Sequence, residues 1–295
     1  MKVSGFTFVR NAVKYDYPIV ESIQSLLPLV DEYIVCVGKS EDATLSLIES
    51  IASPKIKIIH SVWDDNLREG GKVLAVETDK AKAAVAADSD WLFYLQGDEL
   101  VHEKDLPVIK NALLQYQHDK DVEGLLFNYI HFYGSYNYIG DSRRWYKNEI
   151  RVIRNNQNIH SWKDAQGFRK ENVKLKVKSI DAYIYHYGWV KTPRQQNEKQ
   201  KDFGKLWRTD EEIAAHKAWL ETLQNGFDYN NQVDSLSLFN GTHPQVMQER
   251  ISKADWHFEF DVTKKKFRDI KKQLLYYIEK TTGKRLFEYR NYKEV

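Results

Sequence analysis

The sequence is poor in cysteine, with one such residue, Cys36, among 295. A single cysteine excludes an intrachain disulfide framework, and it cannot build a structural zinc site without ligands of other kinds. Cys36 lies in an apolar segment, so we interpret it as a small buried hydrophobic residue. The fold must therefore depend on a hydrophobic core, for which this length is ample.

The sequence also has no strong excess of charge and no long apolar run. Its 44 Lys and Arg oppose 42 Asp and Glu, and the formal net charge is +2. This balance gives no overall attraction to nucleic acid, so no nucleic-acid partner is expected. No apolar run has the length of a transmembrane segment, and the first residues predict a strand rather than a secretion signal. We expect a cytoplasmic protein.

The sequence does contain a regular alternation of short apolar runs and amphipathic segments. Strands are expected at Val3–Val9, Tyr33–Val37, Ile56–Ile59 and Trp91–Leu95, and helices are expected to begin near Pro18, Ser40 and Gly71. This order predicts an α/β fold in which right-handed crossovers build a parallel sheet with helices on both faces.

One segment of ten residues, Asp90 to Glu99, carries the strongest chemical signal. Large apolar residues from Trp91 to Leu95 predict a buried strand, and two adjacent carboxylates, Asp98 and Glu99, follow Gly97. Carboxylates at the carboxyl end of such a strand can hold a divalent cation against the phosphates of a nucleotide. The alternative interpretation is a solvated acidic turn after a core strand.

Three segments in this order, FTFVRN, DEYIVCVGKSEDAT and DWLFYLQGDE, resemble the nucleotide-binding half of a family-2 glycosyltransferase with the GT-A fold. The resemblance covers about the first third of the chain by motif. It implies a Rossmann-like, mostly parallel central sheet flanked by helices, with a helical C-terminal extension. We expect a catalytic domain at residues 1–191 and a mainly helical extension at residues 192–295.

The chain departs from the family at both of its motifs. Of Asp-x-Ser-x-Asp-x-Thr it keeps Ser40, Asp42 and Thr44, but Gly38 replaces the first Asp, which in the family usually contacts the nucleotide base. Of Asp-x-Asp only the last residue, Asp98, remains, and the resemblance assigns it as a metal ligand. The residues implied to contact the nucleotide sugar are Arg10, Ser40, Asp42, Lys72, Gln96, Gly97, Asp98 and Arg151.

A second metal ligand is expected in the aromatic segment from Ala182 to Lys191. Alternation along a strand would place Tyr183, Tyr185 and Tyr187 on one face and His186 on the other. Some GT-A enzymes have a metal ligand near the end of the catalytic domain, and this resemblance implies that role for His186. The expected ion is Mn²⁺ or Mg²⁺. The alternative is a hydrogen-bonded core histidine.

An inverting transfer needs a base that takes the proton of the attacking acceptor hydroxyl. The family places a carboxylate between its metal motif and its closing helices, and Asp164 occupies a comparable segment. Asp164 is therefore the expected base, and Glu99 is the rival. The alternative for Asp164 is a structural turn, because Asp-Ala-Gln-Gly has turn chemistry.

The remaining signals are aromatic, basic and amphipathic. Aromatic residues crowd the span from Tyr129 to Tyr146, which suits a glycan or other hydroxyl-bearing acceptor as well as a core under a loop. Residues 264–280 predict an amphipathic helix that packs on the core or mediates a dimer, so the oligomeric state stays open.

These observations favour a glycosyltransferase that moves a sugar from a nucleotide-sugar donor to a hydroxyl acceptor, with inversion implied by the family and a divalent metal. Two alternatives are a catalytically degenerate carbohydrate-binding protein, favoured by the two missing aspartates, and a nucleotidyltransferase. The second lacks its usual glycine-rich loop, because Val9-Arg10-Asn11-Ala12 follows the first strand without glycine.

Overall fold

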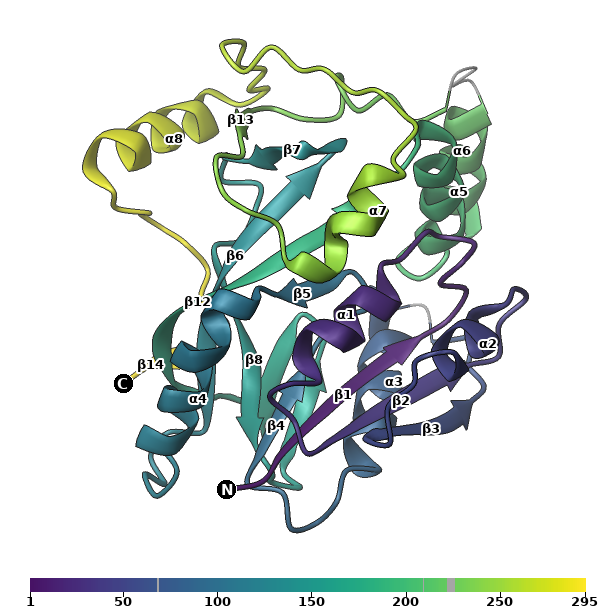
Figure 1. Ribbon diagram of the computed structural model, residues 1–295. Coiled ribbons are helices and arrows are strands. Elements are labelled where there is room, and N and C mark those ends of the chain that lie inside the picture. The colour runs from purple at the N-terminus through teal and green to yellow at the C-terminus, as the bar shows by residue number, and fades with distance from the viewer. Residues whose placement is uncertain (68, 209, 222–225) are drawn as a thin grey trace.

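A mixed sheet of 11 strands with helices on its flanks forms the centre of the molecule (Figure 1). The computed structural model describes residues 1–67, 69–208, 210–221 and 226–295. The main path of the sheet has the order β13-β7-β6-β8-β4-β1-β2-β3, and β12 pairs with β5, β6 and β14 beside it. A separate three-stranded sheet has the order β11-β10-β9.

The bounds of the elements are as follows. The strands of the main sheet are β1 (Val3–Val9), β2 (Glu32–Gly38), β3 (Ile56–Ser61), β4 (Trp91–Tyr94), β5 (Glu99–Val101), β6 (Gly124–Tyr133), β7 (Ser135–Gly140), β8 (Asn148–Arg154), β12 (Lys176–Trp189), β13 (Leu236–Leu238) and β14 (Lys293–Glu294). The small sheet contains β9 (Ile159–Trp162), β10 (Gly167–Lys170) and β11 (Val173–Lys174). The α-helices are α1 (Ile19–Leu26), α2 (Thr44–Glu49), α3 (Lys72–Ala83), α4 (Leu106–Gln115), α5 (Pro193–Gly204), α6 (Asp210–Glu221), α7 (Gln248–Ser252) and α8 (Ile270–Thr282). Three short 3₁₀ turns lie at Glu69–Gly71, Glu103–Asp105 and Gln245–Met247.

The first half of the chain forms the parallel part of the sheet. β1 lies between β2 and β4, and β2 also pairs with β3, all in parallel. Beyond β4 the sheet continues with β8 and then β6, each in antiparallel pairing with the strand before it. This order, with helices between the parallel strands, confirms the predicted GT-A-like α/β architecture.

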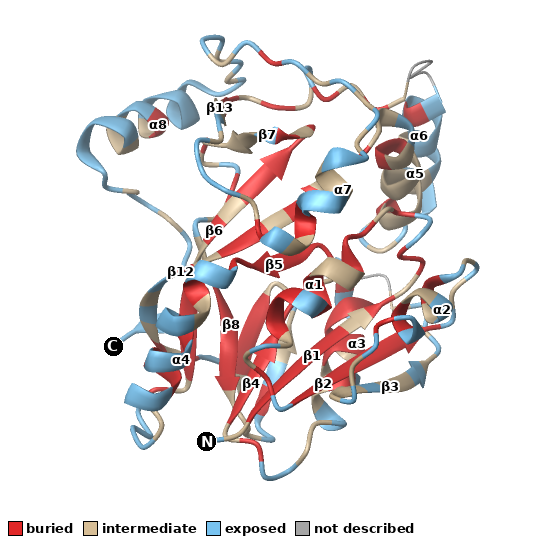
Figure 2. Ribbon diagram, viewed as in Figure 1, coloured by how far each residue is buried: buried red, intermediate tan, exposed pale blue. Residues whose placement is uncertain are grey.

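Both faces of the sheet are buried along β1, β2 and β4, which explains the continuous apolar runs in these strands (Figure 2). In β2, Tyr33 and Val35 contribute to the cluster that contains residues of α1, α2 and α4. Ile34 and Cys36 point the other way, into the cluster that contains residues of α3 and the small sheet. Cys36 is fully buried, which confirms its interpretation as a core residue.

The segment after residue 191 contains α5 to α8 together with two short strands of the main sheet. β13 pairs with β7 and β14 pairs with β12, so this segment is built into the sheet. α5 and α6 lie together near the carboxyl ends of β1 and β2 (Figure 1). Within the described ranges, no helix combines the length and the apolar character that crossing a bilayer requires.

Candidate active site

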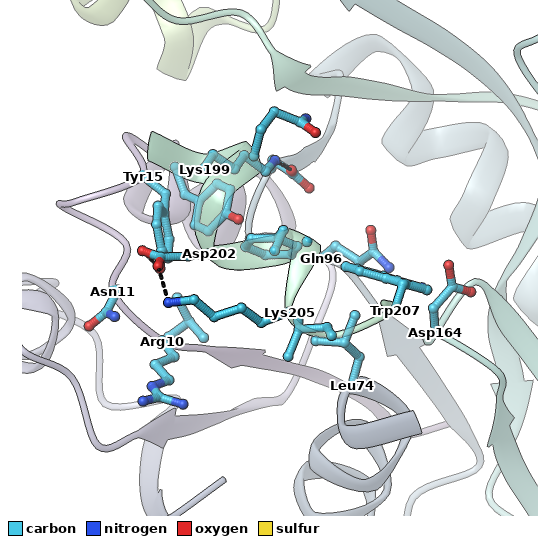
Figure 3. A pocket seen from close by; sticks show the side chains of 18 of the residues that line it. Arg10, Asn11, Tyr15, Leu74, Gln96, Asp164, Lys199, Asp202, Lys205 and Trp207 are labelled. Carbon is cyan, nitrogen blue, oxygen red and sulfur yellow. Dashed lines mark hydrogen bonds and ion pairs between the residues drawn. The ribbon is translucent and has the colours of Figure 1, made fainter. Parts of the chain in front are cut away.

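A cavity of about 1150 Å³ opens at the carboxyl edge of the parallel strands. Its walls come from the residues that follow β1 and β4, from the end of β12, from the turn between β9 and β10, and from α5 with the residues after it. Arg10 and Asn11 lie on one side of it, and Asp164 and Trp207 lie on the other (Figure 3). A switch between neighbouring parallel strands at this edge is where open α/β sheets bind their ligands.

Asp98 lies at the floor of this cavity, between two nitrogen groups. Its Oδ1 is 3.7 Å from His186 Nε2, and its Oδ2 is 3.4 Å from Lys199 Nζ. Gly188 makes this approach possible, because a Cβ at that position would lie 2.6 Å from Asp98 Oδ2 and 2.7 Å from His186 Nε2. The chain therefore packs a carboxylate against the end of β12 where any larger residue would separate it from the imidazole.

The charge of Asp98 is maintained although the residue is buried. Burial alone would raise the pKa of its carboxyl, but the nearby Lys199 ammonium lowers it below its ordinary value. Lys199 in turn has a pKa lowered by burial, against the opposing effect of Asp98. Its Nζ also lies 4.7 Å from the ring centroid of Tyr17 and donates a hydrogen bond to the Gly188 carbonyl.

The hydrogen bonds of two histidines determine which nitrogen of His186 faces Asp98. His131 Nε2 lies 2.8 Å from the Tyr146 carbonyl, which can only accept, so this nitrogen carries a proton. Burial lowers the pKa of His131 well below its usual value, so its Nδ1 is an acceptor. His131 Nδ1 lies 3.0 Å from His186 Nδ1, which therefore donates. The pKa of His186 is lowered by burial as well, and a neutral His186 presents the lone pair of Nε2 to Asp98.

This donor set fits a divalent cation that also takes ligands from a substrate. Within the described residues, no group of three or more His, Cys, Asp or Glu side chains could hold a metal ion. Asp98 and His186 provide one oxygen and one nitrogen ligand, and Mg²⁺ or Mn²⁺ characteristically completes its shell with water and substrate phosphates. Such a pair suits an ion that arrives with a diphosphate.

At the cavity wall near β2, Trp63 and Arg10 lie beside Gly38, which replaces the first aspartate of the motif. A Cβ at Gly38 would lie 2.5 Å from Trp63 Nε1 and 3.2 Å from Arg10 Cβ. The Trp63 indole thus occupies the space beside the glycine, and the Arg10 guanidinium lies 5.4 Å from its ring centroid. Arg10 also pairs with Asp65 at 3.1 Å. A flat aromatic ring and the Arg10–Asp65 ion pair therefore lie at this end, where Gly38 replaces the first aspartate of the motif.

Asp164 lies in the tight turn between β9 and β10. The neighbouring Lys163 and Ala165 have φ of 55° and 62°. The half-buried carboxyl lines the cavity, and burial raises its pKa above the ordinary value for aspartate. Gln96 reaches from the end of β4 to this turn, since its Nε2 donates to the Ala165 carbonyl at 3.2 Å. The turn and the Asp98 segment are thereby tied together.

Five residues that the sequence singled out lie outside the cavity lining in the described part of the chain. Glu99 and Arg151 are both fully buried and form a two-point ion pair, with Arg151 Nε and an η-nitrogen each 2.7 Å from a carboxylate oxygen. Tyr129 Oη donates to the same carboxylate at 2.9 Å. Glu99 is thus engaged behind Asp98 instead of facing the cavity, and Arg151 is engaged with it.

The other three hold loops or face solvent. Ser40 Oγ accepts from the Asn11 backbone, and Asp42 accepts from the Lys14 and Thr44 backbones, so both fix the loop after β1. Lys72 is exposed at the start of α3. Among the predicted residues, the structure brings together at the cavity Arg10, Gln96, Gly97, Asp98, Asp164 and His186.

The sequence reasoning missed residues whose place depends on how distant segments pack. These include Trp63, Trp189 and Trp207 in the lining, and His131 behind His186, whereas Tyr146 in the lining belongs to the aromatic span that the sequence singled out. His131 is one residue in an aromatic strand, and nothing in its neighbours distinguishes it from a core residue. For Trp63, the available sequence signal was Gly38, because this glycine replaces the aspartate that the family has at that position.

Comparisons with known proteins give no match among family models or curated proteins. Solved structures do match. TarS 1–349 of S. aureus shares 14% identity over 74% of this chain and 71% of that chain, with a TM-score of 0.39. A longer TarS structure is covered over 43% of its length.

Two further structures extend the comparison. A 4-diphosphocytidyl-2C-methyl-D-erythritol synthase from Anaerococcus prevotii shares 12% identity over 75% of this chain and 96% of that chain, with a TM-score of 0.39. The mannosyltransferase PcManGT from Pyrobaculum calidifontis, solved with GDP-Man and Mn²⁺, shares 16% identity over 42% of this chain and 34% of that chain, with a TM-score of 0.31. The GT-A-like fold of this chain follows from the order and direction of the strands described above.

Proposed function

We propose that this chain is a glycosyltransferase that moves a sugar from a nucleotide-sugar donor to a hydroxyl acceptor with the help of Mn²⁺ or Mg²⁺. The observation that carries the proposal is the meeting of Asp98, the His186 Nε2 lone pair and the Lys199 ammonium at the carboxyl edge of a parallel sheet. A carboxylate and an imidazole suit a divalent ion, and an adjacent ammonium suits the phosphates that such an ion carries.

In this proposal the nucleoside lies at the end of the cavity near β2. The Trp63 ring offers a face for the base, and Arg10 offers hydrogen-bond donors beside it. Ser40 and Asp42 act indirectly, because they hold Asn11 and Lys14 at the cavity wall. The bound metal supplies Lewis-acid stabilisation of the leaving diphosphate. Lys199 adds a positive charge at the same place.

Asp164 is the proposed base that accepts the proton of the attacking hydroxyl. Its pKa is raised by burial, and a less acidic carboxyl holds the transferred proton more firmly. Gln96 positions the turn that carries it. The acceptor would pack on the aromatic rings of Tyr146, Trp189 and Trp207, whose flat faces suit a sugar ring. In this arrangement residues 1–191 provide the catalytic domain, and α5 of the following segment closes the cavity.

The decisive test compares the Asp98→Asn variant with Glu41→Gln, which changes an exposed carboxylate at the rim of the same cavity. Purified protein is incubated with a panel of nucleotide sugars, with Mn²⁺ or with a chelator, and the released nucleoside diphosphate is measured. We expect metal-dependent release by the wild type and by Glu41→Gln, and a loss of at least about 100-fold in Asp98→Asn. An Asp98→Asn variant with wild-type turnover would overturn the metal assignment.

Assays of binding and of a second substrate pair distinguish the alternative functions. Tight, metal-dependent binding of a nucleotide sugar without any turnover would favour a binding protein, which the loss of the first aspartate at Gln96 also favours. Formation of pyrophosphate from a nucleoside triphosphate and a sugar phosphate would indicate a nucleotidyltransferase.

A further inference from the structure

The outward face of α8 is apolar, although surface helices usually turn their polar side to solvent. Ile270, Leu274 and Tyr277 follow one another at the spacing of one helix face, and their side chains are 85%, 59% and 47% exposed. Figure 1 shows α8 at the margin of the molecule, away from α5 and α6, and Figure 2 shows that most of it is exposed. The helix predicted over residues 264–280 begins only at Ile270, Phe267 precedes it and packs against Tyr276, and the predicted apolar positions Ile270 and Leu274 face outward.

Contacts on the opposite side of α8 fix this orientation. Tyr276 is buried, and its Oη donates to Asp141 at 3.0 Å. Glu279 forms ion pairs with Arg143 at 3.0 Å and Lys147 at 2.5 Å. These interactions hold the polar and aromatic inner face against the body of the protein. The outer face is therefore presented as a stable surface.

The chain after α8 contains further exposed apolar residues. Phe287 is 88% exposed and has a φ of 57°, an unusual conformation for a residue with a large side chain. Leu286 and Tyr289 are exposed beside it in sequence. Exposed apolar residues in such number, on adjoining segments, are characteristic of a surface that binds a partner.

Positive charge surrounds these apolar residues. Residues 264–290 contain ten Lys and Arg against three Asp and Glu, a formal net charge of +7, whereas the whole chain has a net charge of +2. Lys271, Lys272 and Lys284 are exposed next to the apolar residues. The rest of the chain is therefore net acidic, and the net positive charge of the protein comes from residues 264–290.

We propose that α8 and the segment through Tyr289 dock the protein on an anionic phospholipid surface. A helix with exposed Ile, Leu and Tyr bordered by lysines matches the composition of helices that lie in the headgroup region of a bilayer. A second copy of this chain would bring two strongly basic regions together, and nucleic acid would leave Ile270 and Leu274 without an apolar environment. The anionic bilayer satisfies both the charge and the apolar side chains.

Vesicle sedimentation of the full chain tests the proposal. Vesicles of phosphatidylcholine alone are compared with vesicles that also contain phosphatidylglycerol. We expect binding to the anionic vesicles only, with a marked decrease as salt is raised well above about 0.1 M, because screening shortens the range of surface charge. Absence of binding to anionic vesicles at low salt would overturn the proposal.

Two sets of substitutions separate insertion from plain charge attraction. The triple change Lys271→Gln, Lys272→Gln and Lys284→Gln should lower partitioning by on the order of 100-fold. The double change Ile270→Ser and Leu274→Ser should lower it by at least about tenfold. Exposed positions elsewhere, Lys110→Gln with Lys120→Gln and Val62→Ser, should leave it unchanged. Full retention of binding by the Ser variant would contradict insertion.

A direct probe of insertion uses the scarcity of cysteine. Cys36 is buried, so Phe287→Cys provides a unique exposed thiol for a polarity-sensitive fluorophore. Its emission should shift to the blue on anionic vesicles, whereas the same label on Val62→Cys, an exposed position after β3, should not respond. A concentration-dependent dimer that Leu274→Ser abolishes would instead identify a second copy as the occupant and overturn the proposal. None of these measurements involves a nucleotide sugar, so their outcome is independent of the proposed transferase activity.

Discussion

At the scale of single residues, the proposed metal site depends on a side chain that lies behind it. His186 can offer Nε2 to a cation only while its Nδ1 holds the proton, and His131 Nδ1 is the group that accepts this proton's hydrogen bond. His131 is fixed in its own tautomer by the Tyr146 carbonyl. Partners of this kind orient metal ligands in proteins generally. His131 is therefore a positioning residue for His186.

Replacing His131 tests this role. His131→Phe removes the hydrogen-bond acceptor of His186 and should weaken Mn²⁺ binding by about 10–100-fold. The binding is measured in the presence of a nucleoside diphosphate, from the electron paramagnetic resonance signal of free Mn²⁺. His131→Gln should restore much of the affinity, because its amide can accept from His186 and donate to the Tyr146 carbonyl. The control is His243→Phe, which removes another histidine that is hydrogen-bonded to a side chain, Tyr187. Equal Mn²⁺ affinity in His131→Phe and His243→Phe would contradict the role.

The pH dependence of turnover tests Asp164. A general base must be unprotonated, so kcat/KM should rise with pH through the pKa of Asp164 in the free enzyme. Because burial raises this pKa, the acidic limb should lie above the ordinary aspartate value of about 3.9. Asp164→Asn should lose transfer but keep metal-dependent nucleotide binding. An acidic limb that persists in an active Asp164→Asn variant would assign the titration to another group.

At the scale of elements, α5 brings Lys199 over the cavity. The helix begins with a capping box, in which Thr192 Oγ1 accepts from the Gln195 backbone and the Gln195 side chain accepts from the Thr192 backbone. Its other end is held by Asp202, which accepts from Tyr15 Oη at 2.9 Å and pairs with Lys14 at 2.8 Å. The loop after β1 and α5 are thereby joined across the cavity.

Substitution of Asp202 should loosen this closure. Burial alone would raise the pKa of Asp202, but Lys14, Lys205 and Tyr15 lower it to about 2. Its stabilising effect is therefore present above the unfolded pKa of about 3.9 and is lost as pH falls through about 2. Asp202→Asn should increase amide hydrogen exchange of α5 at neutral pH by roughly tenfold.

Glu198→Gln is the matched control for that measurement, because among the described residues Glu198 pairs with Lys201 of the same helix and with no residue outside it. Such an exposed pair contributes little, so exchange in α5 should stay close to that of the wild type. If Asp202→Asn and Glu198→Gln show the same exchange, the contact with the loop after β1 does not hold the helix.

The sequence predicted more of the strands and helices than of the residues in the candidate site. Apolar runs at β1, β2 and β4 identify these strands, because a strand covered on both faces needs large apolar residues throughout. β3 was also predicted, although it lies at the edge of the sheet and is less buried. Glu99 could not be placed in this way. The chain turns at Gln96, whose carbonyl accepts from the Glu99 backbone, and the next strand sends Glu99 toward Arg151. The sequence shows the two charged residues, Glu99 and Arg151, but it does not show that β5 and β8 bring them into contact.

α8 shows a second limit of sequence reasoning. Its apolar spacing predicts a helix with one hydrophobic face, and the helix is present. The direction of that face depends on Tyr276 and Glu279, whose partners lie more than a hundred residues earlier in the chain. Periodicity describes a stripe, and only packing determines which side of the helix meets the protein.

At the scale of the whole molecule, the charge is distributed according to two different tasks. The cavity holds its charges in pairs, such as Asp98 with Lys199, where burial makes an uncompensated charge costly. The region around α8 concentrates exposed positive charge, where solvent makes it inexpensive and a negative surface can be attracted. A nearly neutral chain can thus contain both a paired interior site and a strongly basic face.

The stability of the whole molecule should decrease with rising pH because of one buried carboxyl. Glu149 is fully buried in β8, where one of its oxygens accepts from the Ile150 backbone at 3.0 Å. Burial raises its pKa to about 7. A folded pKa above the unfolded value of about 4.3 means that the stabilising protonated form is fully retained below pH 4 and is lost as pH rises through about 7.

Glu149→Gln keeps the shape of this side chain and removes its titration. The variant should unfold with nearly the wild-type free energy near pH 4, and at pH 8 its free energy of unfolding should exceed that of the wild type by about 3 kcal/mol. Urea denaturation at both pH values measures the difference, and Glu49→Gln, at an exposed position of α2, serves as the control. The gain should appear with Glu149→Gln only, because Glu49 is exposed and its carboxyl stays in water when the chain folds. A constant difference between pH 4 and pH 8 would mean that Glu149 is ionised in the folded protein throughout, with its charge compensated by Arg151 next to it in β8.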